Sequence, residues 1–337
     1  MSLASWSSSE ALRNLQSTPE GRWHKPDAEP DQVARQAASR IGQGFFLPPV
    51  EPAFRLRRTD KVFAIGSCFA RGLEQGLLGR GMDVVSAAKE FDRFELSRPG
   101  VTRLGFTNKY TTAAIRNELT WALHPGAEYP DDAYVPLGDG NWVDLQTNPT
   151  LKYVDLERTR ERRRLITEVT RRITDCRLVV ITLGLVEGWR DTKTGLMTNM
   201  APLPPMLRAE PDRFRFEVME YDQCRADLEA IHRMLTSAGR PDLQIVVTVS
   251  PVPLNATFSG RDVVVANAHS KALLRTAAEE WATRHDDVHY FPSYEIATNS
   301  DPKLVWAEDL RHVQGRTTQT IIGWFLEHYL EPEPAPA

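Results

Sequence analysis

Short apolar runs interrupt the chain and predict β-strands. The three strongest runs are residues 62–65, 178–181 and 245–249, and weaker ones lie at 83–85 and 288–291. Near-continuous apolar runs of this length are typical of parallel strands that are buried on both faces of a sheet. We therefore expect these five segments to form one mostly parallel sheet.

The segments between the strands show helical periodicity. Residues 69–80 have helical character directly after the first strand. Before the next two strong strands, apolar side chains recur three or four residues apart, which places them on one face of a helix. These side chains are Leu165, Val169 and Ile173, and then Leu228, Ile231 and Leu235. The alternation of strands and helices predicts a doubly wound α/β fold.

The remaining segments define the predicted domain organisation. Residues 1–55 are polar and interrupted by prolines, so we expect an N-terminal extension that lies on the main domain. The α/β domain is predicted over 56–330, with insertions near 124–155 and 188–220 that fit no β-α unit. Long insertions in such folds often form lids or substrate walls, so both are candidates for specificity. We expect the tail, residues 331–337, to be disordered.

Composition and charge narrow the classes of function. Of the 337 residues, 41% are hydrophobic, which allows a large core and excludes a disordered chain. The chain has 41 Lys and Arg against 45 Asp and Glu, a formal net charge of -4, so we expect no nucleic-acid partner. The Arg-rich run 158–164 alternates with Glu and is interpreted as the solvated face of a helix.

Neither a membrane span nor a disulfide framework is indicated. No apolar run approaches the roughly 18 residues that a span needs, and the N-terminus lacks a basic segment followed by an apolar one. We therefore expect a soluble, cytoplasmic protein. Cys68, Cys176 and Cys224 are an odd, widely spaced set, which predicts neither disulfides nor a thiolate zinc site.

Candidate site segments follow the three strongest strands. In an open parallel sheet, ligands bind beyond the carboxyl ends of the strands, so segments 66–70, 184–187 and 250–253 should meet at one edge. Cys68 lies at the turn into a helix, where backbone amides and the positive helix end lower a thiol pKa and hold an oxyanion. We expect Cys68 to be a nucleophile and the other two cysteines to be core residues.

The base that a thiol nucleophile needs is predicted near the C-terminus. Asp309 and His312 lie three residues apart in a loop before the final amphipathic helix, so a turn can bring the carboxylate to the imidazole. The other histidines show no metal-ligand spacing, and the turn after the first strand is neither G-x-G-x-x-G nor a P-loop. We therefore expect no metal and no cofactor.

Several of these segments resemble the GSCFA family, a branch similar to the SGNH (GDSL-type) hydrolase superfamily. The resemblance covers roughly residues 55–330 and implies a three-layer α/β/α, flavodoxin-like domain with one site at the strand ends. It implies that Cys68 takes the nucleophile position, that Ser67 takes the place next to it, and that Asp309 and His312 form the last block. The segments that carry it stand in the expected order: Ile65-Gly66-Ser67-Cys68-Phe69-Ala70, Asn108-Lys109-Tyr110-Thr111, Ile181-Thr182-Leu183-Gly184, Thr248-Val249-Ser250-Pro251-Val252-Pro253, Ser270-Lys271-Ala272 and Asp309-x-x-His312.

One block departs from the superfamily pattern. The third block is usually Gly-x-Asn-Asp, whose Asn side chain helps to bind the oxyanion, but the corresponding run here is Gly184-Leu185-Val186-Glu187. Either backbone amides at Cys68 and near Gly184 suffice, or Asn108 supplies the donor from elsewhere. Asn108 is equally readable as the N-cap of a helix over 109–121, since Asn is a preferred capping residue.

Two further polar residues lie at the predicted site. Glu187 follows a strand end, where it is placed to contact substrate or to pair with a nearby arginine such as Arg190. Ser250 precedes Pro-Val-Pro and is interpreted as part of a structural turn on the site, rather than a second nucleophile.

Two functions are consistent with these residues. In the first, Cys68 forms an acyl-thioester, and water or a hydroxyl compound then takes the acyl group. This predicts an acyl-ester hydrolase or O-acyltransferase, with a small-molecule or glycan ester as substrate and acyl-CoA as a candidate donor. The alternative is an inactive SGNH-like module that binds a carbohydrate or acyl ligand, which the missing Asn favours. The sequence leaves the oligomeric state open.

Overall fold

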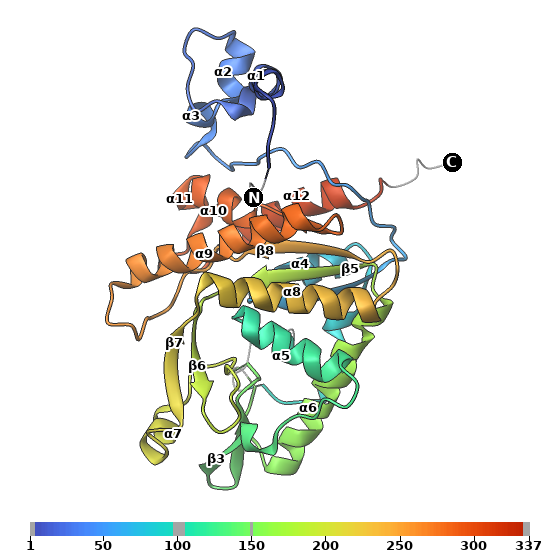
Figure 1. The fold of residues 1–337 in the computed structure, drawn as a ribbon, viewed down its shortest axis with the longest axis vertical. Helices are drawn as coiled ribbons and strands as arrows, with labels where there is room; N and C mark the ends of the chain where they lie inside the picture. The colour runs from blue at the N-terminus through green and yellow to red at the C-terminus, as the bar shows by residue number, and fades with distance from the viewer. Residues whose placement is uncertain (1–3, 97–104, 149–150, 333–337) are drawn as a thin grey trace.

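The central sheet is parallel and contains the predicted strands. The computed structural model describes residues 4–96, 105–148 and 151–332. Within these ranges the main sheet has five strands in the order β2, β1, β5, β8 and β9 (Figure 1). Every pairing between them is parallel, which confirms the predicted doubly wound α/β fold. The bounds are β1 Lys61–Gly66, β2 Asp83–Val84, β5 Leu178–Leu183, β8 Gln244–Val249 and β9 Val288–Tyr290.

The strand register aligns the carboxyl ends of the three central strands. Gly66 at the end of β1 pairs with Thr182 of β5, and Thr182 pairs with Thr248 of β8. The segments that follow these strands therefore leave the sheet at the same edge. The strand order corresponds to the flavodoxin-like order 2-1-3-4-5, in which ligands bind at this edge.

Helices cover both faces of the sheet and complete three layers (Figure 1). Successive strand residues point to opposite faces, so Val62 and Ala64 join one core and Phe63 and Ile65 join the other. This explains why the strands are apolar at consecutive positions. The first core includes α4 (Phe69–Leu78), α10 (Ser293–Asn299), α11 (Pro302–Val305) and α12 (Gly315–Tyr329). The second includes α5 (Thr112–Leu123), α6 (Leu156–Arg171), α8 (Tyr221–Ala238) and α9 (Val263–Arg284).

The segments predicted as insertions pack against each other. Residues 124–155 contain the antiparallel hairpin of β3 (Tyr134–Gly138) and β4 (Asn141–Asp144). The second segment contains α7 (Pro204–Ala209) and the hairpin of β6 (Glu187–Asp191) and β7 (Phe214–Val218). Their apolar side chains form a separate cluster that includes Val135, Val143, Met206 and Phe214. The two segments therefore stabilise each other beside the main domain.

Two arginines of α6 are buried, which corrects the interpretation of this helix as solvated over 158–164. Arg162 and Arg163 are each at most 2% exposed. Arg163 pairs with Glu118 of α5 and lies 3.7 Å from Asp144 of β4. Its charge is compensated by carboxylates from other elements, as a buried charge requires. The local sequence does not show those partners.

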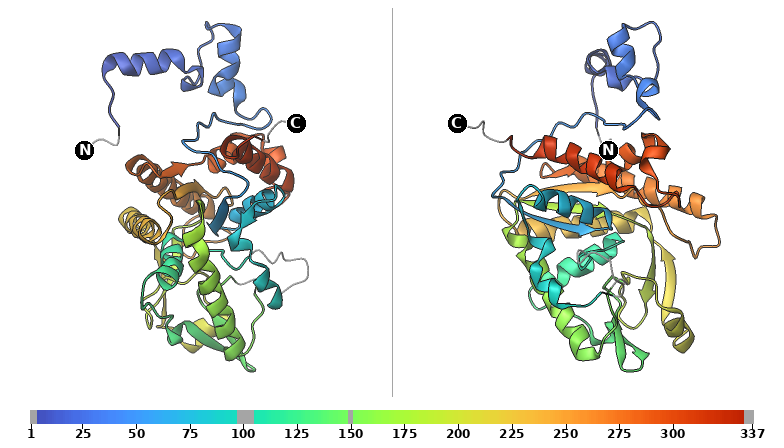
Figure 2. Two further views of the ribbon diagram at one scale, coloured as in Figure 1. Left: turned by 90° about the vertical axis from the view of Figure 1, so that its right-hand side faces the viewer. Right: turned by 180° about the vertical axis from the view of Figure 1, so that it is seen from behind.

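The N-terminal segment has two parts. Residues 42–55 contact the domain; for example, the Gly42 N–H donates to the Asn299 carbonyl at 2.9 Å, and the Trp324 indole donates to the Pro48 carbonyl at 3.1 Å. The preceding helices, α1 (Ser8–Ser17), α2 (Pro30–Arg35) and α3 (Ala37–Arg40), project away from the sheet (Figure 2). None of the helices in the described ranges combines the length and the apolar character that crossing a membrane requires.

Replacing Gly66 with alanine should destabilise the sheet. Gly66 has a φ of +129°, and a Cβ there would lie 2.2 Å from the Thr182 carbonyl oxygen, so Gly66→Ala adds backbone strain and steric overlap. We expect the free energy of unfolding, measured by urea denaturation, to fall by about 2 kcal/mol or more. The control Gly315→Ala has open space at its Cβ position and should change stability by less than about 1 kcal/mol. Equal losses in the two variants would contradict this explanation.

Candidate active site

A cavity of about 530 Å³, here called the rim cavity, lies at the carboxyl edge of the sheet. Its wall is formed by the strand-end segments, by the β6–β7 hairpin with the loop after β6, and by the loop before α12. None of the lining residues in the described ranges comes from 124–155. Six predicted site residues line the cavity: Ser67, Cys68, Gly184, Glu187, Ser250 and His312. Other lining residues, which were not predicted as site residues, include Tyr110, Trp189, Asn199, Phe216, Phe258 and Arg311.

The turn after β1 is fixed against β5. The Ser67 N–H donates to the Thr182 carbonyl at 2.9 Å, and the two hydroxyl oxygens lie 3.2 Å apart. Ser67 is therefore locked and buried, and it does not present a free hydroxyl to the cavity. Cys68 follows it at the N-cap position of α4 and is exposed, whereas Cys176 and Cys224 are buried. The structure thus places one thiol at the strand-to-helix turn.

The surroundings of Cys68 raise the pKa of its thiol. Although the residue is exposed, the surrounding protein desolvates its thiol, and this effect outweighs the opposing influence of Arg311, the Cys68 backbone amide and Lys271. The expectation of a lowered pKa at the helix start is therefore wrong for this structure. Because the thiol is protonated at neutral pH, a nucleophilic role requires a base to remove the proton.

Asp309 holds His312 in the tautomer that a base requires. His312 Nδ1 lies 2.5 Å from Asp309 Oδ2, and Asp309 Oδ1 accepts the backbone N–H groups of Arg311 and His312. These hydrogen bonds hold the pKa of Asp309 well below its usual range, so the carboxylate is ionised and accepts a hydrogen bond from the Nδ1–H group. The other nitrogen, Nε2, lies 2.9 Å from the Arg311 guanidinium. Within the described residues, His312 makes no hydrogen bond to Cys68.

Two backbone amides are free to bind an oxyanion. Within the ranges that the structure describes, neither the Cys68 N–H nor the Gly184 N–H donates to another residue. Both residues line the rim cavity. Gly184 is needed because a Cβ there would lie 2.8 Å from the Tyr110 carbonyl oxygen. Backbone N–H groups in such a position can bind an anionic oxygen in the cavity.

Asn108 occupies neither of the two positions predicted for it, at the oxyanion site or at a helix N-cap. It is buried and does not line the rim cavity, so a role as the replacement oxyanion donor would need a rearrangement. The alternative N-cap role is wrong, because the hydroxyl of Thr111 accepts from the Ala114 N–H and caps α5. Asn108 instead pairs with Gly66 in a parallel β-bridge and so extends the edge of the sheet beside the site.

Asn199 is a site residue that sequence reasoning missed. It lines the cavity from the loop after β6, and its Oδ1 accepts the Tyr110 N–H at 3.1 Å. Its Nδ2 donates to the carbonyls of Asn108 and Thr147. Asn199 therefore positions the Tyr110 segment and has no amide hydrogen left for an oxyanion. Its partners are distant in sequence, so no local pattern identifies it.

A buried lysine connects two of the strand-end segments. Lys271 on α9 donates from Nζ to the carbonyls of Gly184 at 2.8 Å and Val252 at 2.9 Å. The preceding Ser270 accepts the Val186 N–H at 3.0 Å. Burial lowers the pKa of Lys271 to about 7, and no carboxylate in the described residues pairs with it. The Ser270-Lys271 pair therefore positions the wall of the cavity and places a cation near Cys68.

Polar groups without partners face the same region. Glu187 Oε1 accepts from the Thr257 hydroxyl at 2.9 Å, whereas its Oε2 and the Ser250 hydroxyl are buried without a partner. The alternative pairing of Glu187 with Arg190 is wrong, because Arg190 pairs with Glu217 at 2.8 Å. Unpaired buried polar atoms are costly, so a ligand that satisfies them gains affinity.

A group of side chains that could bind a metal ion lies outside the rim cavity. Among the described residues, one group of His, Cys, Asp and Glu has its ligand atoms close together: His232, His285 and Asp287. The Asp287 carbonyl accepts from the Ile245 N–H at the beginning of β8, so this group lies at the amino-terminal edge of the sheet. The rim cavity is at the opposite edge, and the two features are separate.

The flavodoxin-like strand order, with helices on both faces of the sheet, defines a three-layer α/β/α protein with its cavity at the carboxyl edge of the strands. The model of the GSCFA family matches residues 61–325, and the chain belongs to this family, which confirms the resemblance. A comparison with curated proteins gives no match.

Two solved structures show distant likeness to this chain. One is a carbohydrate esterase family 3 protein from Talaromyces cellulolyticus, with 12% identity, 79% of this chain and 94% of that chain covered, and a TM-score of 0.34. The other is a family 3 carbohydrate esterase from Clostridium thermocellum, with 8% identity, 80% and 94% covered, and a TM-score of 0.30.

Cys68 should be the first cysteine to react with iodoacetamide, and its reaction should need raised pH. Cys176 and Cys224 are buried, and burial raises the pKa of these thiols to about 12 and about 11. Because desolvation also raises the pKa of Cys68, its alkylation rate should keep increasing beyond the ordinary thiol value of about 8.5. Peptide mapping from pH 6 to pH 10 measures this. A rate that levels off below pH 8 would disprove the raised pKa.

Proposed function

We propose that this protein is an acyl-ester hydrolase or O-acyltransferase that works through a thioester on Cys68. The observation that supports this most is that Cys68, the Asp309-oriented His312 and two free amides are gathered around one cavity. A nucleophile, an oriented base and oxyanion donors are the parts that acyl transfer requires.

In the proposed reaction, the substrate carbonyl oxygen points to the amides of Cys68 and Gly184. Arg311 leaves His312 Nε2, which then takes the thiol proton as the sulfur attacks the carbonyl carbon. The tetrahedral oxyanion collapses to the acyl-thioester when His312 gives the proton to the leaving oxygen. His312 next deprotonates water or an acceptor hydroxyl, whose oxygen attacks the thioester, and the departing Cys68 sulfur regains the proton.

The wall of the rim cavity suits an acylated glycan or another hydroxyl compound. Trp189, Phe216 and Phe258 pack with ring centroids 5.1 to 5.6 Å apart, and Phe258 is 58% exposed. Such rings offer apolar contact to a sugar face or an acyl chain. The unpaired oxygens of Glu187 and Ser250 can bond to substrate hydroxyls. Acyl transfer requires the cavity to exclude water and to hold an acceptor, whereas hydrolysis does not. Either an ester or acyl-CoA can be the acyl donor.

A binding module for a carbohydrate or acyl ligand is the second candidate. The raised pKa of Cys68 and the Arg311 contact on His312 Nε2 favour it, because both oppose thiolate formation in the free protein. Binding of a ligand in the rim cavity without any acyl adduct on Cys68 would support this candidate over the enzyme.

Activated esters should acylate Cys68. Incubation with p-nitrophenyl acetate or an acyl-CoA should add one acyl group by intact mass, and the adduct should be missing in Cys68→Ala. His312→Ala should slow acylation by about 10²- to 10⁴-fold, since it removes the base. Cys176→Ala is the control and should acylate normally. If no donor forms an adduct, or if Cys68→Ala keeps it, the catalytic proposal fails.

Removing the charge of Lys271 should slow alkylation of Cys68 most at low pH. The ammonium lowers the pKa of the thiol, and it is charged mainly below its own pKa of about 7. The ratio of wild-type to Lys271→Met alkylation rates should therefore exceed one at pH 6 and approach one above pH 8. Lys61→Met, at the opposite edge of the sheet, is the control. If the ratio is one at every pH, in a variant that melts at the same temperature as the wild type, Lys271 does not influence the pKa of Cys68.

A further inference from the structure

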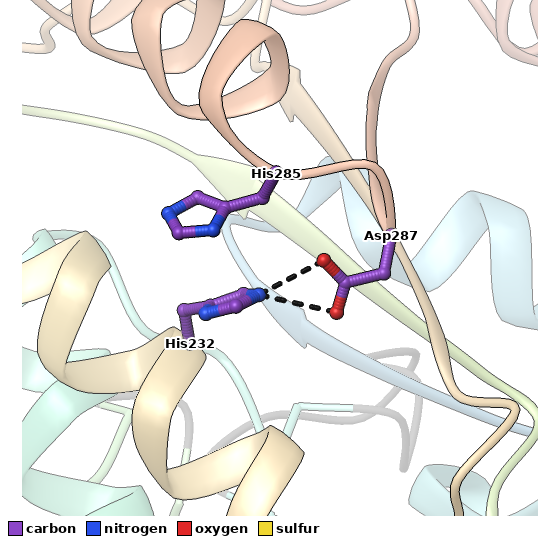
Figure 3. Close-up of side chains that lie close together, drawn as sticks. All are labelled: His232, His285 and Asp287. Atoms are coloured by element: carbon purple, nitrogen blue, oxygen red, sulfur yellow. Dashed lines mark hydrogen bonds and ion pairs between the residues drawn. The ribbon is translucent and has the colours of Figure 1, made fainter.

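A second cluster of chemically active side chains lies at the amino-terminal edge of the sheet. Glu229 and His232 are three residues apart on α8, so they share one helix face. His285 is the C-cap of α9, and Asp287 directly precedes β9. Figure 3 shows the imidazoles of His232 and His285 one above the other, with the Asp287 carboxylate beside them. Two chain segments, α8 and the connection between α9 and β9, thus bring these groups together.

The two ring nitrogens of His285 face different partners. Its Nε2 lies 3.1 Å from both carboxylate oxygens of Glu229. The ionised carboxylate can only accept, so this nitrogen carries the proton and Nδ1 keeps its lone pair. In Figure 3 a ring nitrogen of His285 lies on the side of His232 and Asp287. The nitrogen with the free lone pair therefore lies on the side of the other two residues, although the rings of His285 and His232 are stacked, with centroids 3.9 Å apart.

His232 and Asp287 complete a convergent set of ligand atoms. His232 Nε2 lies 2.9 and 3.1 Å from the two oxygens of Asp287. The ligand atoms of His232, His285 and Asp287 all lie within 4.8 Å of one another. A tetrahedral ion with bonds of about 2.0–2.1 Å separates its ligand atoms by roughly 3.4 Å. The planes of the two stacked rings are 30° apart, so the imidazoles must rotate about their side-chain bonds before both lone pairs point at one ion.

The charge of the cluster suits a divalent cation. Within the described residues, Glu229 and Asp287 have ion pairs only to the two imidazoles, and neither pairs with Lys or Arg. With neutral imidazoles the cluster carries two negative charges. The four side chains are 14% to 29% exposed, so an ion can enter and still be partly shielded from water.

We propose that His232 Nε2, His285 Nδ1 and a carboxylate oxygen of Asp287 bind a divalent transition-metal ion of the Zn²⁺ class. Binding requires the other tautomer of neutral His232: the proton that Nε2 shares with Asp287 is lost to solvent and Nδ1 takes one up, so that Nε2 offers its lone pair to the ion and the imidazole stays neutral. Glu229 acts as the outer acceptor that fixes the tautomer of His285, as carboxylates commonly do for metal-bound histidines. Two imidazoles and one carboxylate favour Zn²⁺ over Mg²⁺, which prefers oxygen ligands.

The bound ion would join α8 to the connection between α9 and β9. This site is independent of the proposed acyl chemistry, because it lies at the opposite edge of the sheet from Cys68. Sequence spacing does not reveal it, since His232 and His285 are far apart along the chain and converge only in the fold.

Zinc titration of the full chain tests the site. After EDTA treatment and removal of the chelator, calorimetry with ZnCl₂ should show one equivalent bound at micromolar Kd or tighter, and MgCl₂ should show none. His285→Ala and Asp287→Asn should weaken Zn²⁺ binding at least 100-fold, and Glu229→Gln about 10- to 100-fold. His124→Ala and Cys68→Ser are controls that should bind as the wild type does. Melting in EDTA checks that each variant is folded.

A second measurement needs no variant. Zn²⁺ should protect His232 and His285, but not His124, from diethyl pyrocarbonate, with the modified peptides mapped by mass spectrometry. The proposal is overturned if Zn²⁺ binds no tighter than about 100 µM, if His285→Ala keeps the wild-type affinity, or if Zn²⁺ leaves the modification of His232 and His285 unchanged.

Discussion

The close approach of β1 to β5 at Gly66 is the constraint on which the candidate site depends. A side chain at this position would overlap the Thr182 carbonyl, and the backbone there has a φ that glycine tolerates best. Because the strands stay in register up to this point, the next residue, Ser67, donates to the same carbonyl. Cys68 then leaves the sheet at a defined angle and begins α4 at the cavity. The position of the thiol is thus set by backbone geometry.

The other side of the cavity depends on α9. Lys271 and Ser270 bond to main-chain groups after β5 and β8, so one helix positions both the Gly184 amide and the segment that carries Ser250. A hydrophobic residue at 271 could fill the same volume but could not satisfy two buried carbonyls. When protonated, the Lys271 amine also lowers the pKa of the Cys68 thiol. A single buried side chain therefore combines positioning with electrostatics.

The sequence predicts the parts of this fold that follow from local pattern. The strands are recognisable because both faces are buried, and the strand-end rule then places Cys68, Gly184 and Ser250 together. Features that depend on distant partners are not predictable in this way. The local sequence suggests that Arg163 is solvated, but in the structure it is buried and paired with Glu118 of α5. Asn199 bonds to Tyr110, which is distant in sequence, so no local pattern identifies it. The prediction of a lowered pKa for Cys68 is wrong for a similar reason. The helix start is visible in the local sequence, whereas desolvation of the thiol depends on residues that are distant in sequence.

The arrangement of Cys68 and His312 in the free protein is consistent with the proposed roles of nucleophile and base. A raised pKa keeps the thiol neutral, and each unit of the shift costs about 1.4 kcal/mol when the thiolate forms. A neutral thiol is also a poor target for oxidants and alkylating agents, which react with the thiolate. Arg311 occupies His312 Nε2 in the same state, so the imidazole is oriented but not yet available. In the proposed reaction, a substrate that draws Arg311 away frees His312 Nε2 to take the thiol proton when a carbonyl is present to receive the sulfur. Under this proposal, deprotonation of Cys68 is coupled to acyl transfer rather than to pH alone.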